Sequence, residues 1–268
     1  MGGDGFLSVE GQSLEYRWLG PGPIDAPTLV FLHEGLGCVA MWRDFPARLA
    51  AATGCGALIY SRAGYGGSDP VALPRTPSYL TIEAHEVLPR VLAASGVADA
   101  ILVGHSDGAT IALLYAAAIT DGPVRGAAIL APHVFVEEVT LAGIREAKLA
   151  FEEGDLRPRL ARFHGGNVDG AFYGWCDTWL NPAFRDWNVE AALPAVRIPL
   201  LIIQGEDDAY GGVEQVRAIA AQVAGPVETM VLAGCGHSPH VDQNGRVLDA
   251  IAGFAGGLLG RPEAAGKR

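Results

Sequence analysis

Short, continuously apolar runs that alternate with helix-length stretches limit the fold of this 268-residue sequence more than any other feature. Continuous apolarity is typical of strands that are buried on both faces. Strands and helices in alternation form a mostly parallel sheet with helices on both faces, which is an α/β fold. The apolar runs are residues 28–32, 57–60, 100–103, 127–130, 200–203 and 227–232, and the helix-length stretches include 41–51, 81–94, 110–119 and 213–223.

Two further patterns divide the chain. Residues 6–9 and 14–19 flank the turn Glu10-Gly11-Gln12 and predict a hairpin at an antiparallel edge of the sheet. The interval from 130 to 200 lacks another buried-strand pattern and is too long for a structureless loop. Its helix-like stretches, 141–152 and 156–163, predict an inserted helical cap over residues 133–190. Residues 1–132 and 191–260 then form one α/β core, and residues 261–268 are expected to be a disordered tail.

The predicted cap is rich in aromatic residues. It holds nine of the chain's 21, in about 22% of the length, and half-exposed aromatics are what a lid over an apolar pocket needs. The i, i+4 spacing of Trp175 and Trp179 fits packing of the cap onto the core equally well. The residues expected to line a substrate pocket are Trp175, Trp179, Phe135, Phe172 and Tyr210.

Charge and cysteine usage exclude several classes of function. The net charge is −11 and no basic stripe is present, so no nucleic-acid partner is expected. No apolar stretch approaches the roughly 20 residues that cross a bilayer, and no targeting segment is evident, which predicts no membrane partner and a cytoplasmic protein. Four scattered cysteines and the absence of a known ligand spacing predict reduced thiols, no metal and no cofactor. A small-molecule substrate is the expected partner, and the oligomeric state stays open, a homo-oligomer included.

A strand, a tight turn and a helix are predicted to meet at Gly104-His105-Ser106-Asp107-Gly108. A nucleophilic serine needs its Oγ pushed out of such a turn, and the crowded backbone leaves no room for side chains two residues before and after it. Gly104 and Gly108 supply that room. The pattern predicts a nucleophile elbow with Ser106 at its tip, the alternative being a phosphate-binding or merely tight turn.

With these residues the chain resembles the α/β-hydrolase superfamily over nearly all of its length. HEGLG at residues 33–37 is similar to the family's oxyanion loop, and GYGGS at 64–68 to its GxGxS turn. GEDD at 205–208 and GHSP at 236–239 match its acid and histidine loops, in the family's order Ser, Asp, His. The resemblance implies an α/β-hydrolase fold with an inserted helical cap.

His237 is the predicted general base, because an imidazole can take the proton of a serine hydroxyl at neutral pH. Its loop follows a predicted strand, at the edge of the sheet where α/β folds place their sites. His240 and His33 are the alternatives, and His33 is expected to organise its own loop through hydrogen bonds.

The carboxylate that orients the histidine is Asp208 or Asp207, since both qualify chemically. The family pattern places the acid three residues after the glycine, which favours Asp208. The N–H groups of Asp107 and Gly35 are the predicted oxyanion hole. Glu34 departs from the common family form, which has glycine there, and a carboxylate that points inward would be unfavourable. We therefore expect Glu34 to turn away or to pair with an arginine.

These roles predict a carboxylesterase-like serine hydrolase that acts on a small to medium apolar ester, or a related carbonyl substrate, through an acyl-enzyme on Ser106. The resemblance leaves two alternatives open: a carbon–carbon bond hydrolase of aromatic ring-cleavage products, and a non-catalytic or slow ligand receptor. The intact set of Ser106, Asp208 and His237 favours an enzyme over a receptor. Four arginines of the predicted cap could bind a substrate carboxylate, but surface solvation is the expected role of Arg145, Arg159, Arg162 and Arg185.

Overall fold

An eight-stranded, mostly parallel sheet organises the chain, of which the computed structural model describes residues 3–119 and 121–260. The strand order is β1-β2-β4-β3-β5-β6-β7-β8. β1 and β2 form an antiparallel hairpin, β2 joins β4 antiparallel, and all other neighbours are parallel. The strands are β1 (Gly3–Val9), β2 (Gln12–Leu19), β3 (Thr28–Leu32), β4 (Gly56–Tyr60), β5 (Ala100–His105), β6 (Val124–Leu130), β7 (Leu200–Gly205) and β8 (Val227–Leu232).

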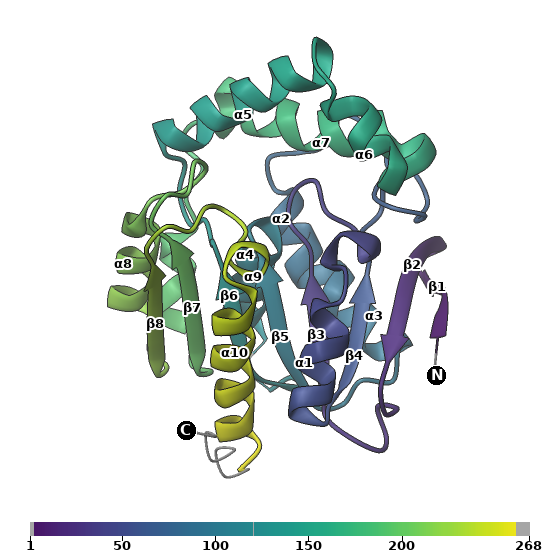
Figure 1. Cartoon of the computed structure of the whole chain (residues 1–268), viewed down its shortest axis with the longest axis vertical. Helices are drawn as coiled ribbons and strands as arrows, with labels where there is room; N and C mark the ends of the chain where they lie inside the picture. The colour runs from purple at the N-terminus through teal and green to yellow at the C-terminus, as the bar shows by residue number, and fades with distance from the viewer. Residues whose placement is uncertain (1–2, 120, 261–268) are drawn as a thin grey trace.

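Helices cover both faces of this sheet and its upper end. α1 and α10 lie on one face, α3, α4 and α8 lie on the other, and α5, α6 and α7 lie over the carboxyl ends of the strands (Figure 1). We refer to residues 138–179 as the α5–α7 layer. The helices are α1 (Phe45–Thr53), α2 (Tyr79–Ile82), α3 (Leu88–Ala94), α4 (Asp107–Ala118), α5 (Glu138–Glu152), α6 (Leu156–His164), α7 (Val168–Trp179), α8 (Val213–Gln222), α9 (Pro239–Asp242) and α10 (Asn244–Leu258).

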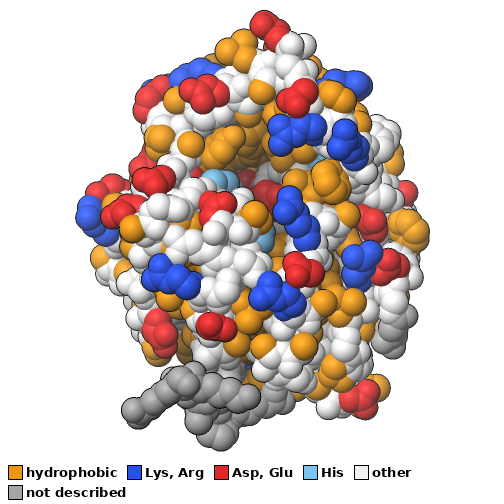
Figure 2. Space-filling model, viewed as in Figure 1, with side chains coloured by type: hydrophobic (Ala, Val, Ile, Leu, Met, Phe, Trp, Pro, Cys, Tyr) orange, Lys and Arg blue, Asp and Glu red, His pale blue; other side chains and the backbone are white. Residues whose placement is uncertain are grey.

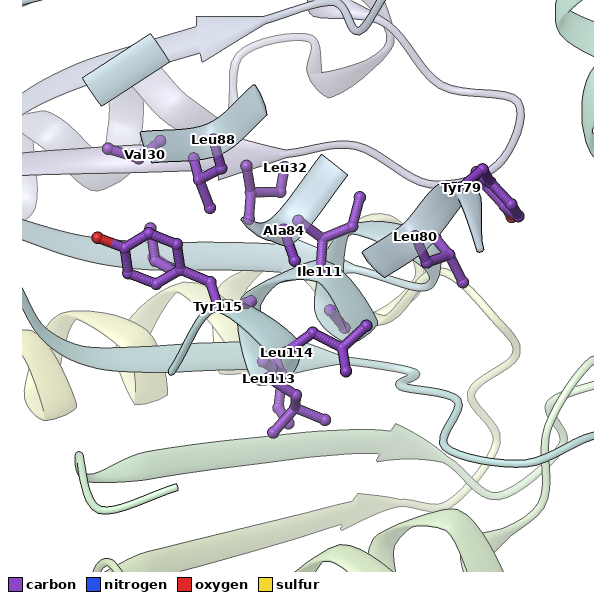
Figure 3. Packing of buried hydrophobic residues seen from close by; sticks show 14 of the residues in the cluster. Val30, Leu32, Tyr79, Leu80, Ala84, Leu88, Ile111, Leu113, Leu114 and Tyr115 are labelled. Atoms are coloured by element: carbon purple, nitrogen blue, oxygen red, sulfur yellow. The ribbon is translucent and has the colours of Figure 1, made fainter. Parts of the chain in front are cut away.

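The central strands contribute side chains to two hydrophobic cores, one on each face of the sheet. Successive side chains of a strand point to opposite faces. In β3, Leu29 and Phe31 join the core under α1 and α10, whereas Val30 and Leu32 join the core under α3 and α4. Figure 3 shows this second core, where the β3 side chains lie among residues of α3 and α4. Burial on both faces is the physical reason that these strands are apolar throughout.

The predicted strands and hairpin are confirmed, with one error in burial. The run at 227–232 forms β8, but β8 is an edge strand and most of its residues are exposed or half-buried, so the prediction that it is buried on both faces was wrong. Glu228 and Thr229 interrupt its apolarity, and Val231 is 45% exposed. An edge strand has a neighbour on one side only and is covered less completely.

Two predicted helices are interrupted in the structure. The stretch 81–94 contains one π-helical turn, Glu83–Val87, between α2 and α3. Pro89 follows that turn, and proline has no N–H to donate to the carbonyl four residues earlier. The stretch 41–51 is divided at Arg43, whose φ of 53° separates a short 3-10 turn, Val39–Trp42, from α1.

The segment between β6 and β7 is helical, as the sequence predicts for 141–152 and 156–163, where α5 and α6 form. The boundaries of a cap at 133 and 190 stay a prediction. The predicted disordered tail, residues 261–268, lies outside the described residues. Within residues 3–119 and 121–260, no helix combines the length and apolarity that crossing a membrane requires.

Candidate active site

Ser106 lies at the turn between β5 and α4 with a backbone that few non-glycine residues adopt. Its φ is 53° and its ψ is −116°, a conformation that costs energy and persists only where the surroundings enforce it. A Cβ at Gly104 would collide with the carbonyl of Gly108, and a Cβ at Gly108 would collide with the carbonyl of Leu32. The two glycines therefore allow the start of α4 to press onto β5 and β3, as a nucleophile elbow requires.

His237 and Asp208 meet at the carboxyl ends of β8 and β7. The Nδ1 of His237 lies 2.9 Å and 2.8 Å from the two carboxylate oxygens of Asp208. Asp208 also accepts hydrogen bonds from the backbone N–H of Tyr210 and from the side chain of Gln204, each at 2.8 Å. Asp207, the alternative acid, is exposed to solvent. Of the two neighbouring carboxylates, the structure brings only Asp208 to the histidine.

Opposing influences set the ionisation of Asp208. Burial raises the pKa of this carboxyl, but the hydrogen bond and charge of His237, with the N–H of Tyr210, outweigh burial and leave the pKa below its ordinary value. Asp208 is therefore an anion at neutral pH. An anion at this place holds the imidazole of His237 with its Nδ1 proton toward Asp208, which leaves Nε2 free to accept a proton.

The two alternative candidates for the general base, His33 and His240, make other contacts. His33 uses one ring nitrogen inside its own loop, where Nδ1 donates to the carbonyl of Glu34 at 2.7 Å, and the other on the loop after β4, where Nε2 accepts from the backbone N–H of Arg62 at 3.0 Å. His240 is 6% exposed and packs against the rings of Trp42 and Phe45. Neither ring lines the cavity described below.

The two predicted oxyanion-hole residues lie on the same cavity as Ser106 and His237. Asp107 is the first residue of α4, where backbone N–H groups have no acceptor inside the helix. Gly35 lies against the indole of Trp175, and a Cβ at this position would collide with that ring. α7 of the α5–α7 layer therefore presses directly on the loop that would hold the oxyanion.

Glu34, which departs from the family pattern, pairs with a histidine, whereas the sequence led us to expect that it would turn away or pair with an arginine. Its Oε2 lies 3.3 Å from Nδ1 of His105, and its side chain folds over Gly37, where a Cβ would collide with it. Burial raises the pKa of Glu34, but the hydrogen bond and charge of His105 outweigh it, so that the pKa lies well below its ordinary value. Arg62 donates to the main-chain carbonyl of this residue at 3.1 Å.

A buried polar chain that sequence reasoning missed joins the elbow to the α5–α7 layer. Trp179 donates from Nε1 to the hydroxyl of Tyr79 at 3.0 Å, and that hydroxyl donates to Oδ2 of Asp107 at 2.7 Å. Arg62 lies 3.6 Å from the same carboxylate and also donates to the carbonyl of His33 at 3.0 Å. The sequence signal for this polar chain is Arg62, which stands two residues after the end of the apolar strand β4. A cation at that place must be buried together with a partner.

These elements line a cavity of about 120 Å³ beneath the α5–α7 layer. Figure 2 shows a hollow under that layer, with hydrophobic and histidine side chains inside it. Three of the predicted pocket residues, Trp175, Trp179 and Tyr210, line the cavity. The other two do not: Phe172 stacks on Phe151 inside the layer, and Phe135 forms a bridge to Asn188. The lining residues that the sequence did not single out for the pocket are Leu36, His133, Thr140 and Ile144.

The comparisons with known proteins identify the family. The sequence matches the family model described as "Alpha/beta hydrolase family" over residues 29–250. The chain belongs to the alpha/beta hydrolase family. No curated protein matches the sequence of this hydrolase. Within the described residues, no cluster of three or more histidine, cysteine or acidic side chains could hold a metal ion.

Solved structures of other hydrolases share its fold over almost the whole chain. An esterase (EaEST) from Exiguobacterium antarcticum is 21% identical, with a TM-score of 0.75 and coverage of 95% of this chain and 99% of that one. The esterase RhEst1 from Rhodococcus sp. ECU1013 is 23% identical, with a TM-score of 0.69 and coverage of 94% and 98%. A serine hydrolase involved in carbazole degradation is 15% identical, with a TM-score of 0.71 and coverage of 96% and 98%. At these identities the likeness establishes the fold alone.

We expect His240 to make the stability of this hydrolase sensitive to acid. Burial, followed by the charge of His105, lowers the pKa of His240 to about 3, whereas a histidine in an unfolded chain titrates near pH 6.5. Between these pH values the unfolded state binds more protons, so stability falls as the pH falls. In His240→Gln, the loss of unfolding free energy between about pH 6.5 and about pH 4.5 should be smaller than in wild type by about 2 kcal/mol.

Urea unfolding at several pH values measures this difference. His85→Gln serves as the control, since His85 is an exposed histidine on another helical segment and its loss should leave the pH dependence of wild type. A pH dependence in His240→Gln that matches wild type would show that burial of His240 does not contribute to acid sensitivity.

Proposed function

We propose that this hydrolase is a serine esterase in which Ser106 is the nucleophile, His237 the general base and Asp208 the carboxylate that orients the base. One observation carries the proposal: a strained serine at the head of a helix and an Asp208-bonded histidine open onto the same cavity. A serine hydroxyl is a weak nucleophile without a base, and an oriented imidazole supplies one.

In the first half of the proposed reaction, Oγ of Ser106 attacks the carbonyl carbon of the ester while Nε2 of His237 takes the hydroxyl proton. The N–H groups of Asp107 and Gly35 receive the oxyanion that forms. Asp208 accepts the Nδ1 proton and stabilises the imidazolium. As the tetrahedral intermediate collapses, the imidazolium gives its proton to the departing alkoxide, which leaves as the alcohol. The product on the protein is an acyl ester of Ser106.

In the second half, His237 takes a proton from water, and the resulting hydroxide attacks the acyl carbonyl. The same two N–H groups receive the second oxyanion. Collapse breaks the bond to Oγ of Ser106, which regains its proton from His237, and the acid is released. The reaction needs no group beyond the residues of this chain and water.

The cavity lining supports a small, uncharged and apolar substrate. Ile144, Leu36 and the two tryptophans supply apolar surface, and Thr140, Tyr210 and His133 supply a few polar atoms. No lysine or arginine stands among the described lining residues, and two of those residues, Glu34 and Asp107, are acidic. An anionic group on the substrate would lose water without gaining a counter-ion. We further propose that residues 133–190 act as a cap, since α7 supplies both tryptophans.

The same lining bears on the alternative function. One structural neighbour is described as a serine hydrolase involved in carbazole degradation. The alternative function is therefore carbon–carbon bond hydrolysis of aromatic ring-cleavage products. Opening an aromatic diol ring leaves a carboxylate on the product, and such a substrate would need a cation in the cavity. None of the four cap arginines named above is among the lining residues: Arg145 and Arg185 pair with Glu138, Arg159 pairs with Asp155, and Arg162 is exposed. The lining therefore favours ester hydrolysis.

A fluorophosphonate probe tests the nucleophile. The wild-type protein should gain the mass of one phosphonyl group on Ser106 and should hydrolyse p-nitrophenyl acetate and butyrate, because the probe traps only an activated serine. Ser106→Ala should gain no adduct and should lose activity by at least about 10³-fold. Intact-mass spectrometry, peptide mapping and absorbance assays measure these outcomes.

The neighbouring carboxylates offer a matched control for the acid. Asp208→Asn should lower kcat by about 10³-fold to 10⁴-fold, because the histidine then loses its oriented tautomer. Asp207→Asn, one residue away and exposed, should keep kcat within about twofold. Absence of both turnover and adduct in wild type would remove the esterase proposal, and equal losses in the two variants would remove Asp208 from its role.

A pair of esters that differ in one charge tests the substrate class. p-Nitrophenyl butyrate and the p-nitrophenyl monoester of succinate have acyl chains of similar length, but the second ends in a carboxylate. We expect kcat/KM for the charged ester to be lower by at least about tenfold, because the cavity offers its carboxylate no cation. Steady-state kinetics at neutral pH gives the ratio. Equal or faster turnover of the charged ester would contradict this account of the lining.

A further inference from the structure

A second histidine–carboxylate pair lies beneath the cavity, outside the proposed triad. His105 immediately precedes the nucleophile, and its ring is 1% exposed. Its Nδ1 lies 3.3 Å from Oε2 of Glu34, on the oxyanion loop, and its Nε2 lies 2.7 Å from the main-chain carbonyl oxygen of His237. One ring thus contacts the loops on both sides of Ser106.

Both partners of this ring are hydrogen-bond acceptors. The carbonyl oxygen of His237 has no proton to donate, and neither has Glu34 as a carboxylate. A neutral imidazole carries one N–H, so one of its nitrogens would turn a lone pair toward an oxygen. An imidazolium carries two and satisfies both contacts. Two oxygen acceptors on one ring therefore favour the charged form.

We propose that His105 is a positively charged positioning residue, which donates one hydrogen bond to Glu34 and one to the carbonyl of His237 and so fixes the oxyanion loop and the loop of the general base around Ser106. The proposal rests on the esterase function proposed above, because it is that function that makes the placement of these loops matter. His105 does not touch the reacting atoms.

The surroundings of His105 support its charge. Burial lowers the pKa of this ring, but the hydrogen bond and charge of Glu34, the carbonyl of His237 and the charge of Asp208 outweigh burial, and the pKa ends above its ordinary value. The rings of His240 and His237 face it at 4.9 Å and 5.1 Å between centroids, and the ring of Trp42 covers it at 6.4 Å. With the pKa of His240 lowered to about 3, that neighbour adds no competing charge at neutral pH.

The pair also accounts for a carboxylate beside the proposed oxyanion hole. Glu34 lines the cavity next to Gly35, and an uncompensated anion there would oppose the negative charge of the intermediate. A cation at His105 offsets that charge from below. Gly37 makes the arrangement feasible, because only glycine leaves room for the Glu34 side chain to fold back.

The protonation of His105 can be measured directly, without any substrate. In a ¹⁵N–¹H correlation spectrum of histidine rings at pH 7, the signals that disappear in His105→Gln should have the shifts of a doubly protonated ring. In Glu34→Gln, the pH at which this ring loses its second proton should fall by at least about one unit, because its counter-ion is gone. A neutral His105 in wild type at pH 7 would overturn the proposal.

Two amide substitutions at His105 test its two hydrogen bonds one at a time by enzyme kinetics. The Asn side-chain nitrogen corresponds to Nδ1 and the Gln nitrogen to Nε2, so His105→Asn keeps the donor to Glu34 and His105→Gln keeps the donor to His237. We expect each to lower kcat for p-nitrophenyl butyrate by at least about tenfold, with KM changed by less than about threefold, since the loops are displaced but the cavity is retained. In Glu34→Gln, the decline of kcat at high pH should begin at least about one unit lower than in wild type.

His240→Gln is the matched control, because His240 is a buried ring packed on His105, and its Nδ1 has no hydrogen-bond partner in the described part of the chain. It should keep kcat within about twofold. Equal loss in His240→Gln and in the His105 variants, or kcat near wild type in both His105 variants, would overturn the positioning role. Failure of the esterase proposal gives a different result: wild type then lacks turnover and adduct, while the ring spectrum still decides the charge of His105.

Discussion

The backbone of Ser106 is the constraint on which the rest of the site depends. Its left-handed conformation costs on the order of 1–3 kcal/mol, and the first turn of α4 holds it by packing where Gly104 and Gly108 leave space. Gly108 lies against the carbonyl of Leu32, the last residue of β3. The loop that follows Leu32 contains Gly35, so this contact also places the start of the proposed oxyanion loop beside the turn of Ser106.

Buried charges connect the loops around this turn. Arg62 is 2% exposed and donates to the main chain of the oxyanion loop at two carbonyls, while its guanidinium lies beside Asp107. Burying an ion pair is costly, and apolar side chains of similar size often stabilise a protein as well or better. Here the charged groups position the loops, because each hydrogen bond fixes one loop relative to the elbow. Tyr79 and Trp179 extend the chain to α7, which also presses on Gly35.

Much of the fold could be predicted from the sequence because the responsible signals are local. Continuous apolarity located the strands, and Gly104 and Gly108 located the elbow, since backbone crowding acts within a few residues. The burial of β8 could not be predicted, because being at an edge depends on strand order. The partner of Glu34 could not be predicted either, since His105 lies 71 residues away. Phe172, Trp175 and Trp179 share one helical spacing, yet only the tryptophans reach the cavity, because position along α7 decides which rings lie over Ser106.

The central claim is that Ser106, His237 and the N–H groups of Asp107 and Gly35 converge on one reacting carbonyl. A crystal structure of the protein after reaction with a small alkyl fluorophosphonate tests it most directly, because the tetrahedral phosphorus resembles the intermediate. We predict phosphorus on Oγ of Ser106, the phosphoryl oxygen about 3 Å from both backbone nitrogens, and Nε2 of His237 within about 3.2 Å of Oγ. A phosphoryl oxygen directed away from both N–H groups, or a His237 ring beyond reach of Oγ, would contradict the account.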